Sequence, residues 1–210
     1  WDLQPHLHGG CLSVASQLNV LGAIAGINGG FFDSSCQPLD LLKADGQLSS
    51  TNDMTGFAQP TLGWNPGVAP TMSWVAPGQD LPEVSSAMGG YPRLVSNGVP
   101  MAEVEPGEQV YSQVDWSQNP RTAVGVTADG SFLLVTVDGR TEAGEGMTTP
   151  ALAPVMLNLG AVNAMGLDGG GSTTMVIREC WIGDVVNYPS DNNQADHQGA
   201  RPVASGLYVR

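Results

Sequence analysis

The segment "RTAVGVTADGSFLLVTVDGR", residues 121–140, constrains the fold more than any other part of the chain. Two runs rich in β-branched residues flank "ADGS", and an Asp-Gly pair between such runs favours a tight reversal. We therefore expect an antiparallel hairpin in this segment. A β-sheet is thus part of the fold.

Two segments carry helix signals. Residues 12–21 repeat apolar side chains at helical spacing, and Gly22 ends the pattern. A second helix is expected at about residues 150–159, where Thr148 or Thr149 offers an N-cap, a proline occupies the first turn and a glycine follows the last. Both helices are short, so the sheet carries most of the fold.

The remaining elements are expected to be strands. Residues 23–27 form an apolar run that ends at two glycines, and residues 38–80 alternate short extended pieces with turn signals, as in a meander. Residues 161–177 indicate a strand, a glycine turn and another strand, and residues 201–210 indicate a closing strand. These elements predict a single α+β domain over residues 1–210, with a mixed, largely antiparallel sheet core covered by two or more helices.

Charge excludes several classes of partner. The chain has 20 acidic and 7 basic residues, for a net charge of -13. Contact with nucleic acid or an anionic membrane surface is therefore unfavourable, and an anionic ligand must be met by a few placed cations. No apolar run is long enough to span a bilayer, so we expect no membrane span. The sequence carries no signal for an oligomeric state.

The ends and the cysteines suggest a compartment. The chain starts at Trp1 with no basic stretch leading into an apolar one, so we expect that a leader has been removed. Few lysines, an acidic composition and three cysteines favour a secreted or periplasmic protein. Cys11 and Cys36 bracket a helix-then-strand segment and are candidates for a disulfide, with Cys180 unpaired; three buried thiols are the alternative.

The stretch "LDGGGST" is the first candidate site. Asp168 stands at a strand end, followed by glycines that let a ligand approach the backbone and then by the hydroxyls of Ser172 and Thr173. On these residues alone the alternatives are a structural turn, a nucleophile or acid, a cradle for phosphate or sugar, and metal ligation. A phosphate-binding P-loop is not indicated, because no Lys-Ser/Thr pair follows the glycines.

Three further motifs carry polar groups at strand ends. Asn28 precedes Gly29 in "GINGGFFD" and is either a pocket residue or part of a turn. Arg121 opens the hairpin, which is ordinarily a solvated position unless an anion is bound there. Asp138 and Arg140 close the hairpin in "VTVDGR", where turn chemistry is the default.

Two histidines stand near the start of the chain. His6 and His8 are spaced to share one face of an extended segment, and with a carboxylate they could hold a divalent metal. We favour the alternative, a surface tail that carries two histidines. No metal site and no cofactor is expected.

The motifs "INGGFFD", "GGYPRLVSNG", "PRTAVGVTADG", "LLVTVDGR", "LGAVNAMGLDGGGSTTMV", "NYPSD" and "RPVASGLYV" occur in an order that resembles the phosphodiester glycosidase family. The resemblance covers residues 12–209. It implies hydrolysis of the bond between an α-linked sugar, such as N-acetylglucosamine, and the phosphate of a phosphodiester. A departure at residues 91–94, "YPRL", suggests a different substrate-facing loop.

The resemblance gives the candidate residues their roles. Asp168 is expected to be the catalytic carboxylate, as nucleophile or electrostatic stabiliser of the positive charge that develops on the sugar ring, with Asp138 as the second acid. Because phosphate is a good leaving group, arginines that hold its charge can replace a strong general acid. The expected substrate-binding residues are Asn28, Gly29, Arg121, Thr122, Arg140, Gly169, Gly170, Gly171, Ser172, Thr173 and Arg201.

Two other functions stay open at this point. A non-catalytic carbohydrate-binding or envelope-assembly module would keep the fold without turnover, although a decayed site would be expected to lose one of the polar residues named above. A glycosidase that acts on a non-phosphorylated acidic polysaccharide would use Arg121 to meet a carboxylate or sulfate. We expect a secreted glycoside hydrolase.

Overall fold

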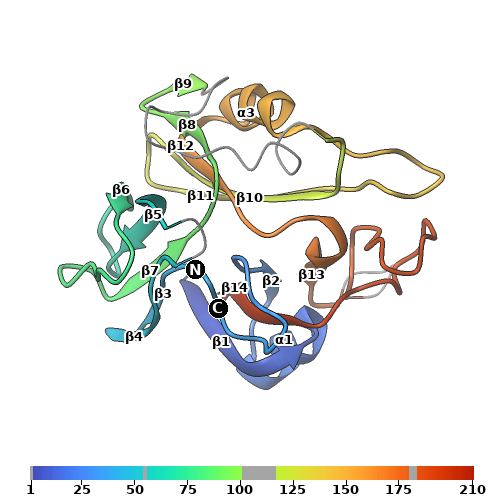
Figure 1. Cartoon of the computed structure of the whole chain (residues 1–210), viewed down its shortest axis with the longest axis horizontal. Helices are drawn as coiled ribbons and strands as arrows, with labels where there is room; N and C mark the ends of the chain where they lie inside the picture. Colours follow the sequence, from blue (N-terminus) through green and yellow to red (C-terminus); the bar gives the residue numbers. More distant parts are fainter. Residues whose placement is uncertain (1, 54–55, 101–116, 180–183) are drawn as a thin grey trace.

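The computed structural model describes residues 2–53, 56–100, 117–179 and 184–210, and it is largely β (Figure 1). Its strands form three sheets, and every pairing between named strands is antiparallel. The expectation of a mixed sheet is therefore wrong for the described residues, in which the parallel contact is an isolated bridge between Ser190 and Gly199. Short hairpin connections explain the result, since parallel strands need long crossovers.

The first sheet joins the two ends of the chain. Its strand order is β1 (Leu3–Leu12), β14 (Val203–Val209), β2 (Ala25–Asn28) and β13 (Met175–Ile177). The expected first helix is confirmed as α1 (Val14–Leu21), which lies at the lower edge of Figure 1. The Ser13 side chain caps its first turn, and Gly22 ends it in the left-handed conformation with φ 64°.

The expectation of a surface tail is wrong, because His6 and His8 lie on strand β1. His8 is buried between β1 and β14: Nδ1 lies 2.7 Å from the carbonyl oxygen of Val203, and Nε2 lies 2.8 Å from the hydroxyl of Tyr208. Since a carbonyl oxygen only accepts, Nδ1 carries the proton and Nε2 accepts from Tyr208. Burial lowers the pKa of His8 to about 4, so the ring is neutral. Both ring nitrogens of His8 are therefore used in hydrogen bonds between β1 and β14.

The second sheet contains the predicted hairpin. Its order is β11 (Phe132–Val137), β10 (Arg121–Thr127), β12 (Ala161–Gly166), β8 (Arg93–Ser96) and β9 (Val99–Pro100). The hairpin is confirmed, with Arg121 opposite Val137 and Val126 opposite Phe132. Helix α3 (Thr149–Asn158), capped by Thr148, packs Leu152 and Met156 against this sheet, and it confirms the second predicted helix.

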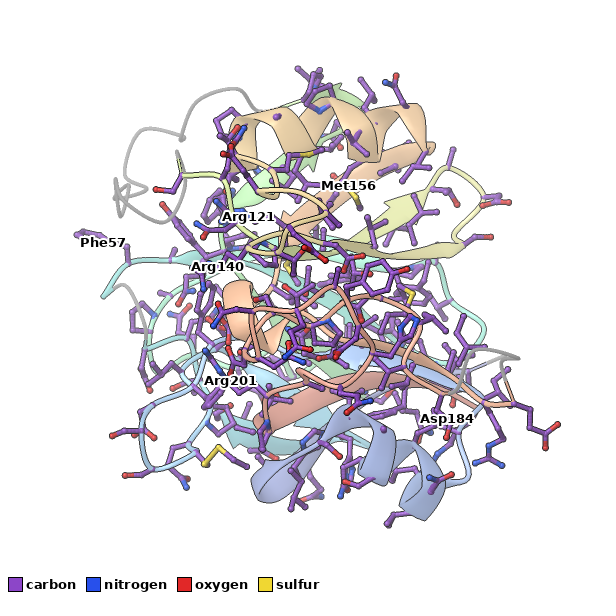
Figure 2. The ribbon with its side chains drawn as sticks, turned by 90° about the vertical axis from the view of Figure 1, so that its right-hand side faces the viewer. Phe57, Arg121, Arg140, Met156, Asp184 and Arg201 are labelled. Atoms are coloured by element: carbon purple, nitrogen blue, oxygen red, sulfur yellow. A yellow bond between two sulfur atoms is a disulfide. The ribbon has the colours of Figure 1, made fainter. Side chains whose placement is uncertain are left out.

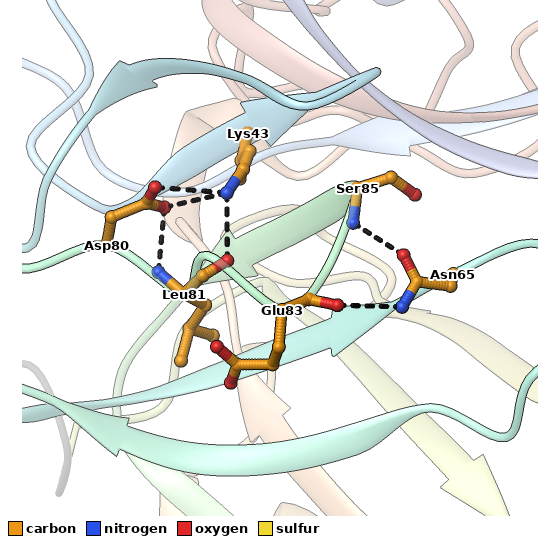
Figure 3. A network of polar contacts seen from close by, with 6 residues as sticks. All are labelled: Lys43, Asn65, Asp80, Leu81, Glu83 and Ser85. Carbon is orange, nitrogen blue, oxygen red and sulfur yellow. Dashed lines mark hydrogen bonds and ion pairs between the residues drawn. The ribbon is translucent and has the colours of Figure 1, made fainter.

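The third sheet has the order β4 (Gln47–Ser50), β3 (Leu42–Ala44), β7 (Ser86–Gly89), β5 (Gln59–Trp64) and β6 (Thr71–Val75). The short strands expected between residues 38 and 80 are present, but β7 separates the two hairpins, so the order is not a simple meander. Lys43 is buried here; its ammonium lies 3.0 Å from Asp80 Oδ2 and donates to the carbonyl of Leu81 (Figure 3). The Lys43 ammonium group therefore helps to stabilise the third sheet.

The main core lies between the three sheets. One buried cluster joins Ile27 of the first sheet, Leu62 and Met88 of the third, and Val124 and Met165 of the second. The two described helices pack on separate sheets, through clusters of their own. The core is therefore sheet against sheet, and the expectation of a helix-covered core describes only the outer faces of two sheets. No helix of the described residues is long and apolar enough to cross a membrane.

A disulfide joins β1 to the loop after β2. Cys11 and Cys36 are bonded, with a Cα–Cα distance of 5.3 Å, so the disulfide is confirmed and the alternative of three free thiols is wrong. Cys180 lies outside the described residues. The bond closes a loop with a sequence separation of 25 residues, which contains α1 and β2.

We expect the double replacement Cys11→Ser and Cys36→Ser to lower the free energy of unfolding by about 3 kcal/mol, because a crosslink of this span restricts the unfolded chain. Urea denaturation monitored by tryptophan fluorescence measures the change, and the reduced wild-type protein is the matched control. An unchanged denaturation midpoint in both would contradict the expectation.

Candidate functional site

The "LDGGGST" segment lies where the first two sheets meet. After β12 the chain continues extended: the Leu167 N–H donates to the Thr122 carbonyl at 2.8 Å, and the Asp168 N–H donates to the Gly29 carbonyl at 3.2 Å. A 3₁₀ turn, η1 (Gly170–Ser172), then reverses the chain. The backbone of Asp168 is thus held between β10 of one sheet and the end of β2 of another.

A cavity of about 420 Å³ opens at this junction. Its polar lining includes eight of the residues predicted from the sequence: Arg121, Thr122, Arg140, Asp168, Gly169, Gly170, Gly171 and Arg201. Its apolar lining includes Phe31, Tyr91, Pro92, Leu94 and Leu152. A concave site with an apolar wall and a few convergent polar groups is typical of small-molecule binding.

Basic side chains gather at this cavity. Arg121, Arg140 and Arg201 line it, and Figure 2 shows them one below another along one side of the molecule. The remaining basic residues of the chain do not line the cavity: they are Lys43, Arg93, Arg178 and Arg210. In a chain with a net charge of -13, this concentration marks a site for an anion.

Hydrogen bonds to residues 117–119 and to Met147 hold two of the arginines. Arg121 is 8% exposed, and it donates from Nε to the Met147 carbonyl at 2.9 Å and from Nη2 to the Ser117 carbonyl at 2.7 Å. Arg140 Nε donates to Asn119 Oδ1 at 2.9 Å. These carbonyl and amide oxygens are neutral acceptors, and they orient the two guanidinium groups.

Arg201 differs because it is paired with an acid. Its Nε lies 2.7 Å from Asp191 Oδ2 and its Nη2 lies 2.8 Å from Asp191 Oδ1, a two-point ion pair. The "NYPSD" motif thus supplies Asp191, for which no role was predicted from the sequence. Asn119 was missed in the same way; its position two residues before Arg121 was the available signal.

The glycines make room for these arginines. A Cβ on Gly170, whose φ is 58°, would lie 2.9 Å from Arg140 Nη1. A Cβ on Gly171 would lie 1.7 Å from Asp191 Oδ1 and 2.5 Å from Arg201 Nη2. The glycines were expected to let a ligand approach the backbone. Instead, Gly170 and Gly171 leave the space that the side chains of Arg140, Arg201 and Asp191 occupy.

We expect Gly171→Ala to displace the Asp191–Arg201 pair and to lower the free energy of unfolding by about 1–3 kcal/mol, since an added methyl in a filled space forces its neighbours apart. Thermal denaturation measures the effect. Gly144→Ala is the matched control, because nothing lies within 4 Å of a Cβ there. Equal behaviour of the two variants would argue against the packing role.

Asn28 lies beneath the cavity. Its side chain is fully buried: Oδ1 accepts from the Thr122 hydroxyl at 2.8 Å and the Thr174 N–H at 3.1 Å, and Nδ2 donates to the Asp168 carbonyl at 2.7 Å. These bonds hold the backbone on both sides of the site. The residues predicted to contact a ligand that lie below the lining are Asn28, Gly29, Ser172 and Thr173.

The Asp168 carboxyl group carries a perturbed pKa. Burial raises its pKa to about 6, while the Ser172 hydroxyl, the Arg201 charge and the Gly169 N–H favour the ionised form and oppose the rise. Ser172 Oγ is buried and has no other hydrogen-bond partner among the described residues, so its hydroxyl can donate to the Asp168 carboxylate. The carboxylate is therefore ionised above about pH 6; it interacts with Arg201 and shares the cavity with Arg121 and Arg140.

Asp138 lies outside the cavity lining. Its Oδ1 accepts from the Tyr188 N–H at 2.8 Å and from Asn187 Nδ2 at 3.1 Å, which fastens the hairpin end to the loop that leads to Arg201. The structure thus brings Asp168 together with the arginines, whereas the second predicted acid is not part of the lining. Among the described residues, no group of three or more histidine, cysteine or acidic side chains could hold a metal ion.

Comparisons with known proteins identify the family of the chain. The sequence profile of the phosphodiester glycosidase family matches residues 21–210. N-acetylglucosamine-1-phosphodiester α-N-acetylglucosaminidase of Bos taurus is 43% identical over 74 residues, which are 35% of this chain and 13% of that protein. An uncharacterised SPbeta prophage-derived protein of Bacillus subtilis is 29% identical over 109 residues, 44% of this chain and 17% of that protein. The alignments thus span less than a fifth of these curated relatives.

Solved structures share the fold. The zebrafish N-acetylglucosamine-1-phosphodiester α-N-acetylglucosaminidase catalytic domain, auto-inhibited by its pro-peptide, has a TM-score of 0.80 at 21% identity and covers 100% of this chain and 73% of that one. A putative exported protein of Burkholderia pseudomallei has a TM-score of 0.65 at 20% identity and covers 99% of this chain and 71% of that one. With the family profile extending over residues 21–210, the chain belongs to the phosphodiester glycosidase family.

Proposed function

We propose that the chain hydrolyses the bond between the anomeric carbon of an α-linked sugar and a phosphate oxygen, in a substrate like an N-acetylglucosamine-1-phosphodiester. The observation that carries the proposal is the convergence of Arg121, Arg140 and Arg201 with Asp168 on one cavity of an acidic protein. A cavity of about 420 Å³ is within the usual range for small-molecule sites. The glycosidic carbon would lie at Asp168 and the phosphate at the arginines.

Asp168 supplies the negative charge that this reaction needs. As the bond from carbon to the phosphate oxygen breaks, positive charge develops on the sugar ring, and an ionised carboxylate stabilises it or attacks the carbon. Water then provides the hydroxyl group of the free sugar, and its remaining proton passes to solvent or to the phosphate. The products are the free sugar and a phosphomonoester.

The arginines hold the departing phosphate. Arg121 and Arg140 line the cavity, where their guanidinium groups can bind an anion, and Arg201 adds a third guanidinium group, which is paired with Asp191. Stabilising the leaving group in this way replaces a strong general acid. The buried polar residues below the lining, Asn28 and Thr173 among them, act through the backbone that they fix.

A direct assay tests the proposal. Incubation with a sugar-1-phosphodiester, or with UDP-N-acetylglucosamine, is expected to release free sugar, and inorganic phosphate is expected to compete. Binding of glycans with no sugar release would favour a non-catalytic module. Release from an acidic polysaccharide that is insensitive to phosphate would favour a glycosidase of non-phosphorylated linkages.

We also propose that the protein works outside the cytoplasm, in a secreted or periplasmic setting. The Cys11–Cys36 disulfide supports this location, because such bonds persist in oxidising compartments. A structural relative from Burkholderia is described as a putative exported protein. Fractionation of the producing cells tests the location.

A further inference from the structure

A buried carboxyl group lies behind the wall of the cavity. Asp40, just before β3, is 1% exposed; its Oδ2 accepts from the Phe31 N–H at 2.5 Å and its Oδ1 accepts from Gln59 Nε2 at 2.9 Å. Both donors are neutral, and among the described residues no cation forms an ion pair with it. Burial raises the pKa of Asp40 to about 7.

Asp40 contacts the segment that supports Asp168. A Cβ on Gly30 would lie 2.3 Å from Asp40 Oδ2, so the carboxyl group rests on bare backbone. On one side of Gly30, the Gly29 carbonyl accepts from the Asp168 N–H; on the other side, Phe31 lines the cavity. Residues 29–31 therefore contact both the carboxyl group of Asp40 and the backbone of Asp168.

We propose that Asp40 is a positioning residue for Asp168, which fixes residues 29–31 and sets, through its own charge, how strongly the cavity attracts an anion. This inference rests on the proposed function. While Asp40 is neutral, Asp168 is the carboxylate that the described residues contribute to the lining, beside three arginines. Ionisation of Asp40 adds a second negative charge behind the site and weakens the binding of an anionic substrate.

The surroundings of both groups determine the order of ionisation. Asp168 is faced by the Ser172 hydroxyl, the Gly169 N–H and Arg201, and it shares the cavity with Arg121 and Arg140. Asp40 is faced by Phe31, Gln59 and Asp168; Lys43 on β3 is committed to Asp80. The negative charge of Asp168 raises the pKa of Asp40. As a coupled pair, Asp168 loses its proton first and Asp40 second.

The first test is the pH dependence of kcat/KM for a sugar-1-phosphodiester, whose own single charge stays constant near neutrality. In the wild type we expect a rise through about pH 6 and a fall above about pH 7, with KM carrying the fall. In Asp40→Asn the rise is retained and the fall is lost, so that kcat/KM at about pH 8 exceeds the wild-type value by about fivefold.

Asp33→Asn is the matched control. Asp33 lies in the same loop, where its Oδ1 accepts from the N–H groups of Ser35 and Gln37, and an asparagine can make the same contacts. This variant is expected to keep the wild-type fall above neutrality. If Asp40→Asn also keeps it, the proposal is overturned.

A second test needs neither turnover nor a folded Asp40 variant. Carbon-13 NMR of the aspartate carboxyl carbons follows Asp40 directly in the wild type and in Asp168→Asn. We expect its titration midpoint to move to lower pH in Asp168→Asn, because the neighbouring charge is gone. An unchanged midpoint overturns the proposal even if the enzyme is active. A shifted midpoint in a protein that cleaves no phosphodiester leaves the coupling intact and refutes the proposed function instead.

Discussion

Replacing Asp168 with asparagine is expected to lower kcat for a sugar-1-phosphodiester by about a thousandfold or more, in the range seen when a hydrolase loses a central carboxylate. The amide has nearly the same shape but no charge, so it neither stabilises nor attacks the sugar cation. The fold is expected to survive, because the backbone of this residue is held by the Gly29 carbonyl and by Asn28. Steady-state kinetics together with circular dichroism measure both properties.

Asp45→Asn is the matched control for this change. Asp45 is exposed in the turn between β3 and β4 with φ 50°, a conformation that asparagine also adopts, and its loss removes the same charge far from the cavity. Asp138→Asn is expected to have an intermediate effect of about tenfold, through the loop that Asp138 holds. If Asp168→Asn were about as active as Asp45→Asn, the catalytic carboxylate would have to be a residue other than Asp168.

The raised pKa of Asp168 has consequences of opposite sign for activity and stability. Activity should rise with pH through about 6, because the ionised form is the active one. Stability changes in the opposite direction. The folded state binds the Asp168 proton more tightly than the unfolded state does, so the contribution of Asp168 to the free energy of unfolding falls as pH rises from about 4 to about 6. Asp168→Asn is therefore expected to be no less stable than the wild type at neutral pH.

Local chemistry explains which parts of the fold were predictable. The hairpin of β10 and β11 is specified by its Asp-Gly turn, and both helices are specified by their caps, Ser13 and Thr148. These signals act over a few residues and do not depend on the rest of the chain. The elements they mark were found with nearly correct bounds.

Long-range pairing explains what was missed. Strand β1 contains two glycines and two histidines and pairs with β14, so that Leu3 lies opposite Val209 at the far end of the chain. No short-range pattern encodes such a partner. The same applies to the division into three sheets, since the insertion of β7 between two hairpins depends on contacts between distant segments.

The site was predictable in its charges and unpredictable in its packing. Because the chain has only 7 basic residues, arginines within motifs were informative, and three of them line the cavity. The sequence could not show that Gly170 and Gly171 seat Arg140 and Arg201, because those contacts depend on how two separate loops return to η1. Asp40 was missed for the same reason. The segment "LDLLKADG" has the pattern of an ordinary strand followed by a turn, and only the structure shows that the Asp40 carboxyl group is buried and accepts a hydrogen bond from Phe31.

Arg121→Lys tests whether the arginines hold a phosphate. We expect kcat/KM for a sugar-1-phosphodiester to fall by about a hundredfold or more, because an ammonium cannot make the two-point contact of a guanidinium while also reaching the carbonyls of Met147 and Ser117. Lysine keeps the positive charge and a donor for one of these two carbonyls, so the fold is expected to be better preserved than with alanine.

Inorganic phosphate separates this role from a general loss of activity. If Arg121 binds the phosphate of the substrate, its replacement by lysine should raise the inhibition constant of phosphate along with KM, whereas Arg210→Gln should leave both unchanged. Arg210 is exposed at the end of β14 and does not line the cavity, so it controls for the loss of one positive charge from an acidic protein. A lower kcat with an unaltered inhibition constant would place the phosphate at Arg140 or Arg201, and would leave Arg121 with the structural task of holding the backbone beside α3.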